Sequence, residues 1–119
     1  MIQVCNVLYD HESQEADIEL ESNGVRILCY AHPVKSTNQI NELINNALFA
    51  FQPTDIQIEE SSVPKAIKTN HGYYSYFLIG KAISDSQIQI HDFIIHIGYL
   101  PGDIVIGDYV SCRCLRLDM

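Results

Sequence analysis

The pattern of apolar and polar residues predicts β-strands along most of the chain. Residues 17–22 alternate strictly, with Ile18 and Leu20 on one face and acidic side chains on the other, and residues 25–31 alternate again. Asn23-Gly24 lies between the two runs. Both residues tolerate a positive φ, so this pair favours the two-residue turn of a β-hairpin.

A two-residue turn sets the register of this hairpin. The expected pairs are Ser22 with Val25, Leu20 with Ile27, Ile18 with Cys29, and Glu21 with Arg26. The first three pairs fall on the apolar face, and the fourth is an attractive pair of opposite charges. The turn chemistry and the alternation therefore predict the same hairpin.

Further strands are expected before and after the hairpin. They cover residues 2–10, 55–60, 73–83, 87–99 and 109–117, with residues 61–72 as a loop. Turns are expected at 84–86 and at Pro101-Gly102. The alternation changes phase at His91-Asp92 and again after Cys114, which predicts a bulge or a bend in each of these two strands.

One segment has the period of a helix instead. Its apolar residues recur at three- and four-residue intervals: Ile40, Leu43, Ile44, Ala47, Leu48 and Phe51. Ser36, Thr37 and Gln39 offer capping groups ahead of this stripe, and Pro53 follows it. The pattern predicts one amphipathic helix that packs on the sheet through the stripe.

The predicted order of elements, three strands followed by a helix and then further strands, is that of the OB-fold. We therefore expect a mainly β fold: a five- or six-stranded OB-like barrel with its helix between strands three and four. A flat α+β sheet with one helix across it is the alternative. The chain has 119 residues, 47% of them hydrophobic, which fits a single domain over residues 1–119.

Four short motifs also resemble a group of small, uncharacterised bacterial OB-like β-barrel proteins. They are Cys29-Tyr30-Ala31-His32-Pro33, Gly80-Lys81-Ala82-Ile83, Gly107-Asp108-Tyr109-Val110 and Arg116-Leu117-Asp118. The resemblance is spread over most of the chain and implies the same fold and a bacterial setting. The group has no assigned activity, so the resemblance assigns no functional residue.

The charge of the chain narrows its expected partners. Fifteen acidic and seven basic residues give a net charge of −8, which opposes binding to nucleic acid or to an anionic membrane. Residues 1–60 carry ten acidic and two basic residues, a net of −8, whereas residues 61–119 carry five of each. No apolar run is long enough to span a membrane and no secretory signal is visible, so we expect a cytoplasmic protein.

Two sets of residues are candidates for binding. Asp17, Glu19 and Glu21 share one strand face beside Arg26, and this acidic hairpin face would attract a basic protein, in the manner of an inhibitor or immunity-type protein. A solvated face that only aids solubility is the competing interpretation. The tyrosine run, Tyr73, Tyr74 and Tyr76, continues into Phe77. This aromatic run could stack the bases of a single-stranded nucleic acid, or could belong to the core.

Nothing in the sequence predicts catalysis. It contains none of the common phosphate-binding, hydrolase or metalloprotease motifs. The four cysteines (Cys5, Cys29, Cys112 and Cys114) lack the spacing of a zinc site and are expected to be reduced, with Cys5 and Cys29 the expected pair if a bridge forms. Among the histidines, His91-Asp92 is the candidate for a catalytic site, because bulges re-aim side chains toward sites, and a solvent-exposed polar pair at a bend is the competing interpretation. We therefore expect a non-enzymatic interaction module without cofactor or metal.

Overall fold

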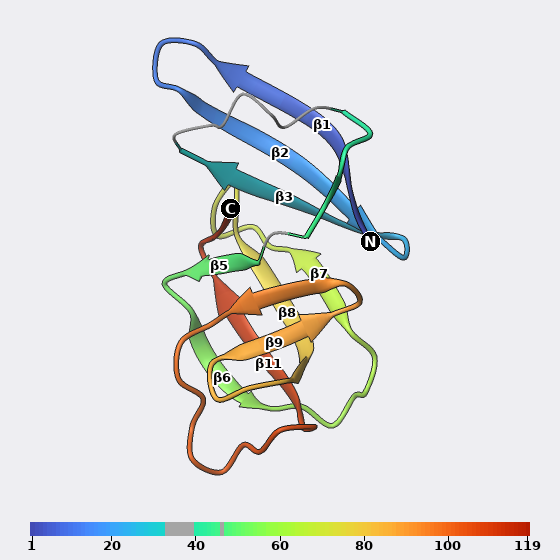
Figure 1. The fold of residues 1–119 in the computed structure, drawn as a ribbon. Helices are drawn as coiled ribbons and strands as arrows, with labels where there is room; N and C mark the ends of the chain where they lie inside the picture. Colours follow the sequence, from blue (N-terminus) through green and yellow to red (C-terminus); the bar gives the residue numbers. More distant parts are fainter. Residues whose placement is uncertain (33–39, 46) are drawn as a thin grey trace.

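The chain folds into twelve β-strands joined in one mixed sheet, as seen in a computed structural model that describes residues 1–32, 40–45 and 47–119 (Figure 1). The strands are β1 (Ile2–Asp10), β2 (Glu15–Ser22), β3 (Val25–Ala31), β4 (Leu43–Ile44), β5 (Leu48–Phe51), β6 (Thr54–Ile58), β7 (Lys65–Lys68), β8 (Tyr76–Ala82), β9 (Gln87–Ile90), β10 (Phe93–His96), β11 (Tyr109–Cys114) and β12 (Arg116–Asp118). None of the described residues is helical. The expectation of a mainly β fold is thus confirmed.

The N-terminal hairpin forms in the predicted register. Ser22 pairs with Val25, Leu20 with Ile27, Ile18 with Cys29 and Glu21 with Arg26. Asn23 and Gly24 have φ values of 49° and 83°, as the predicted turn requires. β1 pairs along the other edge of β2, so β1, β2 and β3 lie side by side at one end of the molecule (Figure 1).

The other strands form a strongly curled continuation of this sheet. Strand order runs β4-β1-β2-β3-β12-β5-β10-β9-β8-β11-β6, and β7 pairs with β8 off this path. Two of the pairings, β5 with β10 and β3 with β12, are parallel. β12 continues β11 after Leu115, so pairing from β11 through β8, β9, β10 and β5 returns to the same stretch of chain.

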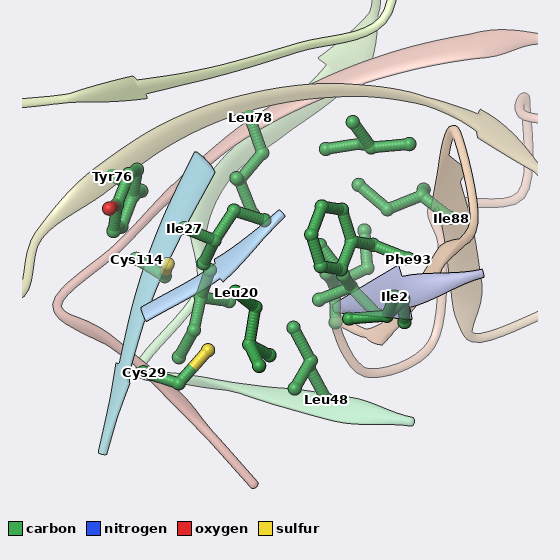
Figure 2. Close-up of a cluster of buried hydrophobic side chains, with 14 of the residues drawn as sticks. Ile2, Leu20, Ile27, Cys29, Leu48, Tyr76, Leu78, Ile88, Phe93 and Cys114 are labelled. Carbon is green, nitrogen blue, oxygen red and sulfur yellow. The ribbon is translucent and has the colours of Figure 1, made fainter. Parts of the chain in front are cut away.

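The curl encloses one cluster of buried side chains, to which both ends of the molecule contribute. Ile2, Leu20, Ile27 and Cys29 come from β1–β3, whereas Leu48, Leu78, Ile88 and Phe93 come from the rest of the sheet (Figure 2). Gly80 lets β9 approach closely, because a Cβ there would lie 3.0 Å from the Gln89 carbonyl oxygen. The core therefore fixes the β1–β3 sheet relative to the other strands.

The prediction of a five- or six-stranded OB-like barrel with one helix is wrong, as is the flat α+β alternative. Residues 43–44 and 48–51 are strands, and the capping residues Ser36, Thr37 and Gln39 lie outside the described part of the chain. Of the predicted apolar stripe, Ile44 and Leu48 are buried but Ile40, Leu43 and Phe51 are exposed. Asparagine-rich sequence has weak helix propensity, and β5 instead finds hydrogen-bonding partners on both edges, in β10 and β12.

Two smaller expectations are also corrected. The predicted loop over residues 61–72 contains β7, which pairs with the first half of β8. The turn near Gly102 begins at Pro101, whose carbonyl accepts from Ile104 N–H at 3.0 Å, one residue later than expected.

The phase changes have different physical causes. At His91-Asp92 the phase change marks a tight turn, because Ile90 pairs with Phe93. The single strand expected there is a β9–β10 hairpin. After Cys114 it marks a change of partners, because β11 pairs with β6 and β8 while β12 pairs with β3 and β5.

Candidate functional site

The acidic hairpin face lies on the side of β2 that points away from the core. Ile18 and Leu20 are fully buried, whereas Asp17, Glu19 and Glu21 alternate with them and are half-buried. Arg26 on β3 joins two of the carboxylates, with a hydrogen bond of 2.6 Å to Glu19 and an ion pair of 3.7 Å to Glu21. The Glu19 contact is the main cause that raises the pKa of Arg26.

Tyrosine hydroxyls hold the other acidic residues of this face. Tyr74 donates to Asp17 at 2.5 Å, and Tyr30 donates to Glu15 at 2.7 Å. Burial and then the Asp17 hydrogen bond raise the pKa of Tyr74, while the Glu15 hydrogen bond is the main cause that raises the pKa of Tyr30. Tyr30 and Tyr74 thus hold Glu15 and Asp17, while Arg26 is shared by Glu19 and Glu21. Arg26 is therefore not alone in offsetting the repulsion between the carboxylates of β2.

The loop that carries Tyr74 is held by its own hydrogen bonds. Ser75 is buried, and its hydroxyl bonds with the Thr69 side chain at 2.6 Å and with the Gly72 carbonyl at 3.0 Å. The Thr69 N–H also donates to the Ser75 carbonyl at 3.0 Å. These bonds close the loop between β7 and β8 and present Tyr73 and Tyr74 to the acidic hairpin face.

The three residues of the tyrosine run have different roles. Tyr76 is 4% exposed, and its hydroxyl accepts the Leu28 N–H at 2.7 Å. Desolvation is the main cause that raises the pKa of Tyr76. Tyr74 packs edge-on against Tyr73, with ring centroids 4.8 Å apart. Tyr73 is 62% exposed and carries the Lys68 ammonium 4.5 Å from its ring centroid, so it is the residue of the run that presents an accessible ring.

The two predicted sets of residues meet in one groove. A cavity of about 340 Å³ is lined by Asn6, Leu8, Asp17, Glu19, Arg26, Ile27, Leu28, Lys68, Tyr73 and Tyr76. Glu21 lies beyond the lining but contacts Arg26, and Tyr74 lines an adjoining cavity that shares Leu8 and Asp17. The structure thus places carboxylates and an exposed aromatic ring together, an arrangement that favours a cationic group.

Sequence reasoning missed the contribution of β1 to this groove. A bulge between Val4 and Asn6 reverses the faces of the strand, so Val7 packs against the core and Leu8 is exposed beside the groove. The signal was present, because apolar Ile2 and Val4 precede apolar Val7 in the opposite phase.

A second surface includes side chains of β5, a segment that the sequence predicted to be helical. Phe49 on β5 is 51% exposed and stacks on His96 of β10, with ring centroids 4.6 Å apart and 8° between the planes. The Arg116 guanidinium lies 4.5 Å from the centroid of Phe51 and bonds to Asp118 through two nitrogens. The cation beside these aromatic rings is therefore already paired with a carboxylate.

The cysteines show no features of a reactive or metal-binding site. All four are free thiols, and burial raises the pKa of Cys29, of Cys112 to about 12 and of Cys114 to about 11. Cys114 lines a second cavity, of about 310 Å³, with His71 and Ser75, but its thiol stays protonated at neutral pH. β2 separates Cys5 on β1 from Cys29 on β3, so the pair expected if a bridge forms does not lie on adjacent strands. The described residues contain no cluster that could hold a metal ion.

The predicted candidate His91-Asp92 lies in a turn, and Asp92 makes hydrogen bonds to distant parts of the chain. His91 adopts a φ of 51° in the β9–β10 turn, and Asp92 accepts hydrogen bonds from the Met1 amine and from the Ser22 hydroxyl, the latter at 3.1 Å. These two bonds, the amine first, lower the pKa of Asp92. The pair therefore ties the β9–β10 turn to the β2–β3 hairpin.

Comparisons with protein families, with curated proteins and with solved structures found no match. The described part of the chain also holds no helix with the length and apolar character needed to cross a membrane. The resemblance to bacterial OB-like proteins gains no support from these comparisons, and the bacterial and cytoplasmic settings stay predictions.

Proposed function

We propose that this protein is a non-enzymatic interaction module that binds a basic protein partner through the acidic hairpin face. One observation carries the proposal: Asp17, Glu19 and the exposed ring of Tyr73 line the same groove. The surplus of acidic residues lies in the half of the chain that contains this face. The electrostatic field of an acidic surface speeds association with a cationic surface and makes the association rate sensitive to salt, as expected of an acidic inhibitor or immunity-type protein.

Single-stranded nucleic acid is the less favoured ligand. Tyr76 is buried and Tyr74 is half-buried with its hydroxyl bonded to Asp17, so Tyr73 is the one strongly exposed ring of the three. Of the two cations in the groove, Arg26 is paired with carboxylates. A stacking platform usually combines several accessible rings with unpaired positive charge, and these two features oppose that arrangement.

The test compares two double charge reversals that change the net charge equally. Glu19→Lys with Glu21→Lys alters the acidic hairpin face, whereas Glu59→Lys with Glu60→Lys alters residues outside the groove lining. Fluorescence anisotropy measures the binding of a labelled Lys/Ser peptide across a salt series, with a Glu/Ser peptide and a dT oligonucleotide as further probes. Thermal unfolding of each variant confirms that it is folded.

We expect saturable, salt-sensitive binding of the Lys/Ser peptide to the wild-type protein. The Glu19/Glu21 reversal should raise Kd by about tenfold or more, which is about 1.4 kcal/mol, and the control reversal by much less. Absence of binding by the wild type, or equal losses in both reversals, would overturn the proposal. Tighter binding of the oligonucleotide than of the Lys/Ser peptide would establish the nucleic-acid alternative. If the first reversal does not fold, Glu19→Gln with Glu21→Gln replaces it, with Glu59→Gln and Glu60→Gln as the control.

A further inference from the structure

The groove already contains a cation in contact with its aromatic wall. The Lys68 ammonium lies 4.5 Å from the centroid of the Tyr73 ring, within cation–π range. Tyr73 itself is 62% exposed, so its ring is accessible from solvent. Asp17 and Glu19 line the same groove, and their two negative charges balance those of Arg26 and Lys68, which also line it.

The two groove cations are held very differently. Arg26 makes a hydrogen bond of 2.6 Å to Glu19 and a second ion pair with Glu21. Lys68 forms no ion pair with any residue that the structure describes, and its ammonium contacts the Tyr73 ring. The backbone of Lys68 is fixed, because β7 pairs it with Tyr76 of β8. The flexible stem of Lys68 can therefore move its ammonium away while the strand stays in place.

We infer that the Tyr73 ring, together with Asp17 and Glu19, forms a recognition pocket for one lysine side chain of the partner, and that Lys68 occupies this position in the free protein. This inference rests on the proposed function, since it names the group that the acidic hairpin face selects. The incoming ammonium exchanges for that of Lys68, so the groove keeps one cation on the ring in both states. A neutral acyl-lysine side chain lacks the charge that the ring and the carboxylates recognise.

Matched substitutions test this exchange. Lys68→Met removes the ammonium but keeps an unbranched apolar stem, and Lys65→Met makes the same change of charge on the same strand outside the groove lining. Tyr73→Ala removes the accessible ring, and Tyr99→Ala is its control, because Tyr99 is 83% exposed and does not line the groove. The probes are the labelled Lys/Ser peptide and the same peptide with every lysine acetylated.

Lys68→Met should tighten binding of the Lys/Ser peptide about two- to fivefold more than Lys65→Met does, since one cation–π contact no longer competes. Tyr73→Ala should weaken binding by a similar factor while Tyr99→Ala leaves it unchanged, and the acetylated peptide should not bind. Equal effects of the two lysine variants, or of the two tyrosine variants, would overturn the lysine pocket. The proposed function would survive that result if the Glu19/Glu21 reversal still lowers affinity, and it fails separately if the wild type binds no basic peptide.

Discussion

Replacing Leu48 by alanine distinguishes the observed strand from the predicted helix. Leu48 is completely buried in β5, whereas Leu43 is 56% exposed in β4. The helical stripe would bury both residues to a similar extent. The observed structure buries only Leu48, so the two substitutions should differ strongly in their effect on the free energy of unfolding.

The magnitude follows from the burial of each side chain. Leu48→Ala removes apolar groups worth about 0.8 kcal/mol for each buried carbon and leaves a cavity beside Ile95, which pairs with Leu48 across the sheet. Together these effects should destabilise the fold by about 2–5 kcal/mol. Leu43→Ala should cost less than about 1 kcal/mol, because more than half of its surface is already in water.

Urea unfolding followed by circular dichroism measures both free energies by linear extrapolation. The wild type and the two variants should show similar m values, so that midpoints can be compared directly. A cost above about 2 kcal/mol for Leu43→Ala, equal to that of Leu48→Ala, would mean that residues 40–51 pack as a helix and would refute the strand assignment. A cost below about 1 kcal/mol for Leu48→Ala would show that β5 does not close the core.

Three further predictions concern the interior of the sheet. Gly80→Ala should lower the thermal midpoint measurably, because the Cβ of the new alanine would lie 3.0 Å from both the Gln89 carbonyl oxygen and Ile90 Cγ1. An unchanged midpoint would contradict this close approach. Ser111→Ala should leave stability unchanged or raise it by about 1 kcal/mol in urea unfolding, because the buried Ser111 hydroxyl has no hydrogen-bond partner among the described residues, and a clear loss would reveal a missed partner. Burial raises the pKa of the Cys112 thiol from 9.0 to about 12, so the folded state holds this proton more tightly than the unfolded state. The stability that the Cys112 proton contributes is complete below pH 9 and is lost by about 1.4 kcal/mol per pH unit as pH rises toward 12. In urea unfolding between about pH 8 and 11, the free energy of unfolding should therefore decline less steeply with pH in Cys112→Ala than in the wild type. An identical decline would refute the burial argument.

The local strand pairing could be derived from the sequence where turn chemistry and alternation agree. Asn23-Gly24 joins two alternating runs, and the hairpin formed in the predicted register. The phase change at His91-Asp92 carried the same information, since a two-residue turn always reverses the phase of the apolar positions. The phase change by itself predicts a bulge or a bend, and the structure shows a turn in which His91 adopts a positive φ.

The segment from 40 to 51 could not be assigned from its own pattern. Its apolar residues fit a helical period over the whole segment, but residues 48–51 are also a short continuous apolar run, which is consistent with a buried strand. What selects the strand is the pair of open edges on β10 and β12, which lie far away along the chain. A short apolar run is ambiguous between helix and strand, and non-local hydrogen bonding resolves the ambiguity.

By itself the sequence determined the β class, the N-terminal hairpin, the acidic face of β2 and the concentration of negative charge in the first half of the chain. These properties depend on neighbouring residues and on turn geometry, which operate over a few positions. The tertiary structure alone decided that the acidic hairpin face and Tyr73 share one groove, that Lys68 contacts this ring, and that Tyr76 is buried. The groove joins β1, β2 and β3 to the loop before β8, and such contacts arise only when the whole core packs.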